Sequence, residues 1–498
     1  MNIPRTLPMV QGERSEPKES NMKSAVVLYS APAAGHLLPM VSLAKLFQEH
    51  GFSATVITFN HPLLSSKTDQ EVSFLSSANP SISFHVLPLI TVGDSYANLK
   101  PPDVTRIIVE AQNKNLQNFI LDLSKTSFVR VIVLDYMCTD ALDAARQLSI
   151  PTYFLTPFSA SFTAFLLNLL ELDVSSSLSL KDFNGPINFP GLPPVLTSDC
   201  PKFLIDRESD SYKAFMQTVP SLVKSDGILM NTFESLEQKA ISALREGNCV
   251  PSFNMPPVYS IGPLVTERRE KEREERHECL KWLDLQPKGT VVFLCFGSLG
   301  GFPLDQVKQI AIGLENSDQR FLWVLKFNTE QSNIYNKSIP EFELDQILPE
   351  GFLNRTKDRG MVVKTWAPQI QVLHHESVGG FVTHCGWNSI LEAVIAGKPM
   401  VCWPLYVEQR LNKVLLVDHD TWLSVAIECY DQDMVVAEEV EAKVRWLMEG
   451  EGSKLLNERA KAMLDKATES LTETGPSSQA FMQFLIDLEQ QHLSKTNI

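Results

Sequence analysis

The segment from residue 366 to residue 409 constrains the fold more strongly than any other part of the chain. It contains an apolar, β-branched stretch at 379–384, a short polar turn, a run of helix-forming residues at 389–397 and a second apolar stretch at 398–404. Gly397 stands where a glycine commonly ends a helix. A strand, a helix and a strand in this order predict a βαβ unit, whose two strands lie parallel in one sheet.

Polar side chains gather where the first of these strands leads into the helix. In parallel α/β sheets, ligands bind at the carboxyl ends of the strands, and a helix N-terminus favours an anion. His384, Asn388 and Ser389 lie at that end. Glu392 follows one turn later and can accept both hydroxyls of a ribose, while Trp366 offers a flat face to a base. The pattern predicts a site for a nucleoside diphosphate.

The whole segment resembles the signature of the plant family 1 UDP-sugar glycosyltransferases. It has the length of that signature, 44 residues, and it matches in the opening WAPQ, the central HCGWNS, Glu392, GKPM and the closing EQ. An ordinary βαβ crossover would explain the apolar residues but not the polar residues among them. The resemblance extends over nearly all of 24–493. It implies an α/β chain with the GT-B fold, in which two Rossmann-like domains face each other across a cleft.

The rest of the chain divides at a charged segment. Residues 266–278 contain six acidic and five basic residues and no apolar residue, which is typical of a linker. We therefore expect a first domain at 24–265, a linker at 266–280 and a second domain at 281–475, because 498 residues exceed one ordinary core. The resemblance assigns the acceptor to the first domain and the UDP-sugar to the second.

Both ends of the chain carry further expectations. Residues 1–23 are polar and include three prolines, so we expect a disordered tail, with Met22 as an alternative start of translation. A helix with an apolar stripe is expected at 476–493. The resemblance implies that this helix packs back on the first domain, although the sequence also allows an ordinary core helix of the second domain.

His36 is the candidate catalytic base. Histidine is the side chain best suited to remove a proton near neutral pH, and His36 lies in a loop after the strand predicted at 24–30, before a helix expected to begin at Pro39. The family has its base in a P-x-x-G-H loop, which Pro32, Gly35 and His36 match. The resemblance therefore implies that His36 deprotonates the acceptor.

Asp135 is the candidate partner of His36. It ends the strand predicted at 129–135 and matches the acid that pairs with the histidine in the family. From the residues alone, Asp135 could instead cap the helix that follows, and Asp140 and Asp143 are rival carboxylates within that helical pattern.

The loop at 156–161 is expected to supply a hydroxyl that contacts the sugar. Ser159 is the residue we favour, with Thr156 and Ser161 as alternatives.

The resemblance also implies how a UDP-sugar is held. Ser298 lies in a Gly-rich loop after the strand predicted at 291–296, where the family contacts phosphate. A closing glutamine such as Gln409 favours glucose in the family. The expected contacts are Trp366, Ala367 and Gln369 with uracil, Glu392 with ribose, Ser298, His384, Asn388 and Ser389 with phosphate, and Trp387, Glu408 and Gln409 with the sugar.

Composition narrows the function further. The net charge of −15 argues against nucleic-acid binding. The most apolar run, 160–170, is shorter than the roughly 20 residues of a membrane span. Eight scattered cysteines without a CxxC pair favour a reduced, cytoplasmic location, and their spacing predicts no zinc site. We expect a monomer without metal or other cofactor.

The expected reaction is inverting transfer of glucose from UDP-glucose to a hydroxyl of a small plant secondary metabolite. The acceptor would be a hydrophobic flavonoid, another phenolic compound or a terpenoid. C-glycosylation of a phenol is the first alternative, followed by a UDP-sugar epimerase and a non-catalytic UDP-sugar-binding protein. The segments 75–110 and 158–215 carry no pattern that names the acceptor, and 62–110 and 160–225 are expected to be irregular.

Overall fold

The computed structural model describes residues 22–61, 65–90, 101–266, 276–327, 342–364, 366–418, 420–432 and 434–496. The expected N-terminal tail lies outside these residues apart from its last two positions. The central part of the expected linker, residues 267–275, lies outside them as well.

The first sheet has seven parallel strands in the order β3-β2-β1-β4-β5-β6-β7. The chain begins in the interior of the sheet at β1, adds β2 and β3 on one side, and then returns to place β4 on the other side. The strands are β1 (Lys23–Tyr29), β2 (Ser53–Phe59), β3 (Ser83–Leu87), β4 (Ser127–Asp135), β5 (Thr152–Thr156), β6 (Gly227–Met230) and β7 (Val258–Ser260).

The second sheet has six parallel strands and the same pattern of connections, in the order β10-β9-β8-β11-β12-β13. Here the strand order reverses between β8 and β11. The strands are β8 (Val291–Cys295), β9 (Arg320–Leu325), β10 (Gly360–Lys364), β11 (Val378–Thr383), β12 (Met400–Cys402) and β13 (Ser424–Ala426).

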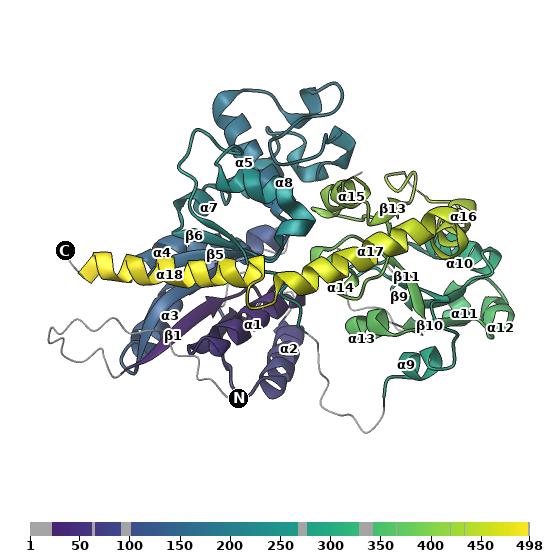
Figure 1. Ribbon diagram of the computed structural model, residues 1–498, viewed down its shortest axis with the longest axis horizontal. Helices are drawn as coiled ribbons and strands as arrows, with labels where there is room; N and C mark the ends of the chain where they lie inside the picture. Colours follow the sequence, from purple (N-terminus) through teal and green to yellow (C-terminus); the bar gives the residue numbers. More distant parts are fainter. Residues whose placement is uncertain are drawn as a thin grey trace.

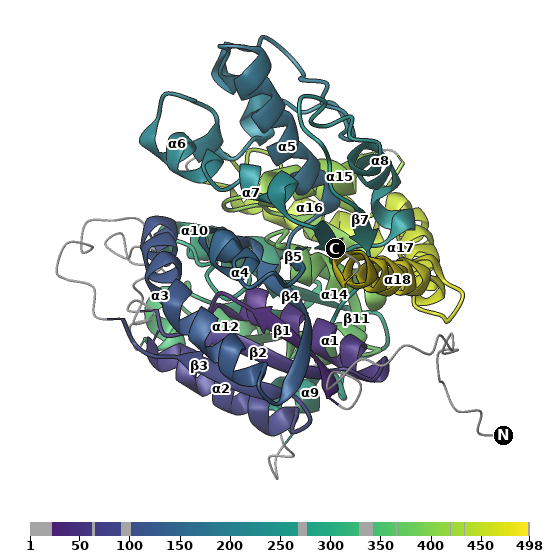
Figure 2. The same ribbon diagram turned by 90° about the vertical axis from the view of Figure 1, so that its left-hand side faces the viewer.

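Helices cover both faces of each sheet (Figures 1 and 2). Those of the first domain are α1 (Ala34–Glu49), α2 (Ser65–Ala78), α3 (Pro101–Leu123), α4 (Leu142–Arg146), α5 (Ala160–Ser175), α6 (Asp210–Met216), α7 (Pro220–Lys224) and α8 (Glu234–Arg245), with the 3₁₀ turns η3 (Tyr136–Ala141), η4 (Leu180–Asp182), η5 (Thr197–Asp199) and η6 (Lys202–Leu204). The later helices are α9 (Glu278–Leu283), α10 (Leu304–Asn316), α11 (Leu344–Ile347), α12 (Phe352–Thr356), α13 (Gln369–His374), α14 (Trp387–Ile395), α15 (Gln409–Val417), α16 (Ala437–Glu449), α17 (Glu451–Ser470) and α18 (Pro476–Thr496).

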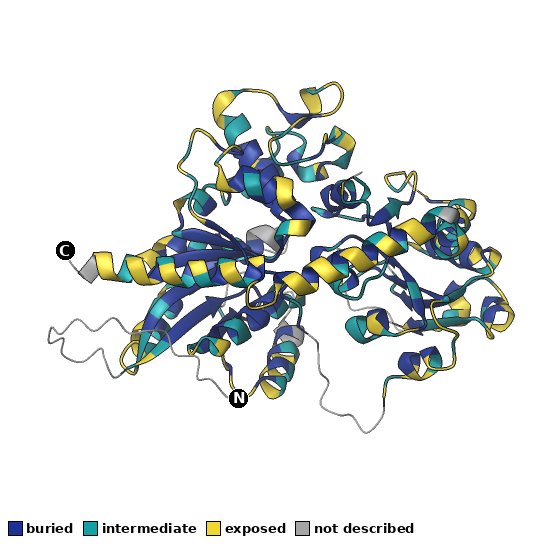
Figure 3. Cartoon of the chain, in the orientation of Figure 1, coloured by how far each residue is buried: buried dark blue, intermediate teal, exposed yellow. Residues whose placement is uncertain are grey.

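The cores lie on the two faces of each sheet, and the interior strands are mostly buried, whereas the edge strands β3, β10 and β13 are partly exposed (Figure 3). Successive residues of β1 alternate between two apolar clusters, Val27 entering one and Val26 and Leu28 the other. The same alternation along β8 places Phe293 and Leu294 in different clusters. Because a strand points successive side chains to opposite faces, a strand covered on both faces appears in the sequence as a continuous apolar run.

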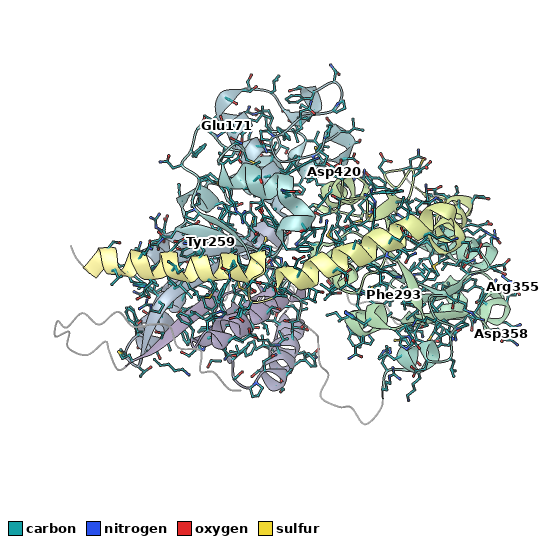
Figure 4. The ribbon with its side chains drawn as sticks, in the orientation of Figure 1. Glu171, Tyr259, Phe293, Arg355, Asp358 and Asp420 are labelled. Atoms are coloured by element: carbon teal, nitrogen blue, oxygen red, sulfur yellow. The ribbon has the colours of Figure 1, made fainter. Side chains whose placement is uncertain are left out.

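The last helix of the chain packs on the first sheet, although it follows the second domain. Figures 1 and 2 show α17 and α18 running from the second domain back across the first. Phe481 and Phe484 of α18 belong to the apolar cluster of β1 and α1. The hydroxyl of Tyr259, labelled in Figure 4, donates to Asp487 of the same helix at 2.6 Å.

Two local predictions were wrong. Helix α1 begins at Ala34, five residues before Pro39, so His36 lies in the first helical turn and not in a loop. Both regions expected to be irregular contain regular elements: 62–110 includes α2 and β3, and 160–225 includes α5, whose residues from Ala160 to Leu170 are all buried. A helix that is apolar on every side has no polar stripe, so its sequence lacks the usual helical period.

Candidate active site

Each sheet has one position where its strand order reverses, and candidate residues occupy both. In the first sheet the reversal lies between β1, which leads into His36, and β4, which ends at Asp135. In the second it lies between β8, followed by Ser298, and β11, followed by His384. Open parallel sheets bind ligands outside the carboxyl ends of their strands at such a reversal, called a topological switch point.

His36 and Asp135 form a close pair at the first switch point. The His36 Nδ1 atom lies 2.8 Å and 3.0 Å from the two carboxylate oxygens of Asp135. Asp135 also accepts from the backbone N–H of Met137 at 2.7 Å, and it is the N-cap of η3. Both interpretations of Asp135, histidine partner and helix cap, therefore apply.

The environment of His36 favours its protonated form. The side chain of His36 is 26% exposed, whereas that of Asp135 is 1% exposed. Burial alone would lower the pKa of His36, but the charge and hydrogen bond of Asp135, together with the charge of Glu408, raise that pKa above its ordinary value. Among the described residues, Asp135 is the only carboxylate that hydrogen-bonds to the ring, and the rivals Asp140 and Asp143 make no such contact.

His384 stands at the second switch point in a different environment. It is 6% exposed, and a Cβ atom placed on Gly297 or on Gly386 would lie only 2.4 Å from its Nε2 atom. Glycine is therefore required at both positions, because the two backbones lie directly against the ring. Burial, with a smaller contribution from Lys326, lowers the pKa of His384 to about 3. Within the described part of the chain, its Nδ1 atom has no hydrogen-bond partner.

Gln369, expected to contact uracil, joins two other residues expected to hold the UDP. The amide of Gln369 donates to the Ser389 hydroxyl at 2.8 Å and to the Glu392 carboxylate at 2.6 Å. Burial raises the pKa of Glu392 to about 7, although the bond from Gln369 opposes the shift. Trp366 lies nearby with its ring partly exposed, and Ala367 is buried.

The phosphate side of α14 contacts the first domain. The Asn388 amide donates to the backbone carbonyl of Gly35 at 2.9 Å. Pro39 explains why this carbonyl is available: it stands four residues after Gly35 within α1 and has no N–H to donate to it. The residue preceding the candidate base is thus joined directly to the helix expected to bind phosphate.

Several predicted residues have structural partners. The indole N–H of Trp387, which is 2% exposed, donates to the carbonyl of Asn231 in the first domain at 2.8 Å. Gln409 accepts from the backbone N–H groups of Leu405 and Tyr406 at 2.9 and 3.0 Å. Trp387 and Gln409 thus stabilise the domain interface and a loop, and their contact with a sugar stays a prediction.

The candidate hydroxyls of the 156–161 loop are also buried. Ser159 caps α5, accepting from the Phe162 N–H at 3.1 Å, and donates to Asn412 of the second domain at 2.8 Å. The backbone N–H of Ser161 donates to the buried Glu237. A sugar contact of Ser159 stays a prediction.

Ser298 and Glu408 are two further residues expected to contact the donor. Ser298 is exposed in the loop after β8. Burial raises the pKa of Glu408 to about 7, and the charge of His36 opposes this shift, so the two side chains interact electrostatically across the domains.

Sequence reasoning missed three residues at this site. Lys326, at the end of β9, donates to the carbonyl of Gly297 at 2.5 Å and so supports the loop that carries Ser298. Asn231 and Asn412 join the domains. Neither a lysine at a strand end nor a single asparagine forms a local motif, so no signal in the sequence distinguished them.

Comparison with known proteins identifies the family. Residues 250–454 match the family model described as UDP-glucoronosyl and UDP-glucosyl transferase. The phloretin 2'-O-glucosyltransferase of Malus domestica is 40% identical over 481 residues, which cover 93% of this chain and 99% of that protein. The chain belongs to the plant family 1 UDP-glycosyltransferases.

Other relatives agree with this assignment. The anthocyanidin 5,3-O-glucosyltransferase of a Rosa hybrid cultivar is 39% identical to this glycosyltransferase over 477 residues, which cover 91% of this chain and 96% of that protein. The structure of Phytolacca americana UGT2 complexed with UDP-2fluoro-glucose and pterostilbene superposes with a TM-score of 0.82 at 32% identity, covering 94% of this chain and 100% of that one. The GT-B prediction is confirmed.

The described residues contain neither a membrane-spanning helix nor a metal-binding cluster. The glycosyltransferase has no helix in these ranges that is long and apolar enough to cross a membrane. No group of three or more His, Cys, Asp and Glu residues is placed there to hold a metal ion.

Proposed function

We propose that this glycosyltransferase transfers glucose from UDP-glucose to a hydroxyl of a small phenolic acceptor, with inversion at the anomeric carbon. The observation that carries the proposal is the pairing of His36 Nδ1 with the buried Asp135 at 2.8 Å. Asn388 links the first turn of α1, which carries His36, to the helix that would bind phosphate. The proposed base and the proposed diphosphate site thus lie on neighbouring elements of opposite domains.

His36 acts as the general base in this proposal. Asp135 accepts a hydrogen bond from the Nδ1–H group, which fixes the tautomer and leaves the lone pair on Nε2 for the acceptor hydroxyl. As the acceptor oxygen attacks the anomeric carbon, its proton moves to Nε2 and the bond to the diphosphate breaks. Attack opposite the leaving group converts an α-linked donor into a β-glucoside. Asp135 also stabilises the imidazolium that forms.

The second domain stabilises the departing UDP. The N-terminal N–H groups of α14 and its dipole favour the diphosphate, and Ser389 and Asn388 lie in the first turn of that helix. His384, which is neutral because its pKa is lowered to about 3, would donate a hydrogen bond to the diphosphate. These groups take the place of a metal ion in the proposal, so EDTA should leave the rate unchanged.

Relatives support the substrate classes. The curated relatives include enzymes named for phloretin and for anthocyanidin, both with O-glucosylation in the name. A related solved structure contains UDP-2fluoro-glucose and pterostilbene. Phloretin, anthocyanidins and pterostilbene are phenolic compounds, and the names of the relatives favour transfer to oxygen over transfer to carbon. Glu408 and Gln409 would offer a carboxylate and an amide to the hydroxyls of glucose.

The test is a screen of phenolic acceptors with UDP-glucose, read by product mass and by linkage. We expect a mass increase of one hexose, an acid-labile β-O-linkage and dependence on His36. An acid-resistant product would identify a C-glycosyltransferase, and sugar interconversion without acceptor would identify an epimerase. UDP-glucose binding without any turnover would leave only a binding protein. Full activity of the His36→Ala variant would contradict the assignment of the base.

A further inference from the structure

Helix α15 packs against the apolar cores of both domains. Leu411 is 2% exposed and belongs to the apolar cluster of the first sheet. Leu415 and Leu416, one turn later, belong to a cluster of the second sheet. The helix therefore lies on the domain interface, and its position depends on both cores.

Polar contacts with the 198–199 segment strengthen the attachment to the first domain. The Lys413 ammonium lies 2.6 Å from the Asp199 carboxylate, with side-chain exposures of 11% and 13%. The Tyr430 hydroxyl donates to the same oxygen at 2.6 Å. Arg410 donates to the carbonyl of Ser198, also at 2.6 Å. A pair this buried is weakly screened by water, so removing one partner leaves a poorly solvated charge.

Two cation–π contacts with Tyr430 belong to the same cluster. The guanidinium of Arg410 and the ammonium of Lys413 lie 5.3 Å and 5.2 Å from the centre of the Tyr430 ring. Burial, and then Asp199, raise the pKa of Tyr430, so its hydroxyl stays protonated and donates to Asp199. Asp199 is the acceptor on which the contacts of Lys413 and Tyr430 converge.

The N-terminal end of α15 carries the residues assigned to the sugar. Glu408 is the N-cap and Gln409 the first residue of the helix. Lys413 follows Gln409 by four positions, so the two lie on one face. Val407, directly before them, has a φ of 52°, which is strained for a β-branched residue. Such a conformation persists only where the surrounding contacts hold it, and here Gln409 binds the backbone of Leu405 and Tyr406.

We propose that Asp199 is a positioning residue for the donor sugar: by holding Lys413, this acidic residue of the first domain sets where α15 presents Glu408 and Gln409. The inference rests on the proposed function, which assigns those two residues to glucose. The nucleoside residues Trp366 and Glu392 lie on other segments, so binding of the UDP portion does not depend on Asp199. The contribution of the glucosyl group to binding depends on Asp199.

The test compares binding of UDP-glucose and of UDP to the whole protein by calorimetry without acceptor. We expect Asp199→Asn to weaken UDP-glucose binding about 10-fold while the UDP affinity stays within about 2-fold, because small displacements of positioning groups have effects of this size or larger. In turnover, the preference for UDP-glucose over UDP-galactose should fall. Lys413→Met should have the same effect, and the double variant should lose no more than either single variant.

Lys239, which lies in the first domain like Asp199, provides a matched control. Lys239 of α8 lies 2.5 Å from Asp420, just beyond α15, but the two side chains are 60% and 63% exposed (Figure 4 labels Asp420). Exposed pairs contribute little, so Lys239→Met should leave both affinities unchanged. A parallel loss of UDP and UDP-glucose affinity in Asp199→Asn, or no change in either, would overturn the proposal.

These outcomes are separate from failure of the proposed function. If the wild-type protein glucosylates no phenol, the proposed function is wrong. The binding comparison still decides the role of Asp199.

Discussion

His36 and His384 each lie at the switch point of one sheet, yet their surroundings give them opposite properties. His36 is partly exposed and bound to a buried carboxylate, which raises its pKa. His384 is enclosed between two glycine backbones, and its pKa falls to about 3. Topology brings a histidine to the ligand-binding edge of each sheet. The groups packed against each ring decide whether it can exchange a proton near neutral pH or stays a neutral hydrogen-bonding group.

The largest effect is expected from removing the imidazole of His36, the proposed base. His36→Ala should lower kcat by about 10²–10⁴-fold, the usual contribution of a positioned base, and leave the Kd of UDP unchanged. Steady-state kinetics and calorimetry measure the two quantities. His50→Ala, at the other end of the same helix, is the control and should keep its kcat. A normal kcat in His36→Ala would remove the functional distinction between the two histidines.

Removing the carboxylate tests why His36 is basic. Asp135→Asn should lower kcat by about 10²-fold, within the range for base catalysis. The base acts when unprotonated, and Asp135 raises its pKa, so the rate of the wild type declines on the acid side as His36 gains a proton. Without the carboxylate this decline should move to lower pH. A pH–rate profile with an unchanged acid limb would show that another group titrates.

The nucleoside site should show a third, smaller effect. Glu392→Gln should weaken UDP binding about 10-fold, since a hydrogen bond to a charged group contributes about 1.5–3 kcal/mol. The pKa of Glu392 is about 7, and the ribose hydroxyls donate to the ionised form. Uridine binding to the wild type should therefore strengthen as pH rises from 6 to 8 and then level off. The variant should show no such dependence, and a pH-independent wild type would contradict the assignment.

The smallest effect is expected at His384. His384→Gln keeps an N–H donor, so kcat should fall only a few-fold, about 3–10-fold, less than when an oxyanion donor is lost entirely. Because the pKa of His384 is about 3, the pH–rate profile between pH 5.5 and 8 should keep its midpoint. A shifted acid limb would mean that His384 also titrates, and the contrast between the two histidines would fail.

Local patterns predicted much of the fold. The strands β1, β4, β8, β11 and β12 lie where apolar runs indicated, because a strand covered on both faces needs such a run. Helix α5 was missed because it is buried on all sides. The start of α1 was misplaced because proline usually opens a helix, whereas Pro39 stands inside this one and leaves the Gly35 carbonyl to Asn388.

The candidate site was predictable to the extent that its residues form motifs. His384, Asn388, Ser389 and Glu392 lie within one βαβ unit, and His36 lies in a short motif of its own. Trp387 and Ser159 were assigned to the sugar, but each has a hydrogen-bond partner in the opposite domain, Asn231 and Asn412. A pattern within one segment carries no information about a partner more than 100 positions away.

The sequence by itself determined the α/β class, the nucleotide-binding segment and the family, because these depend on apolar periodicity and on residues close together in the chain. The tertiary structure decided the rest. Asp135, a candidate for either role from the sequence, both pairs with His36 across 99 positions and caps η3, and α15 links the domains. It also gave the two histidines their opposite pKa shifts, because burial and the charge of neighbouring groups exist only once distant segments pack together.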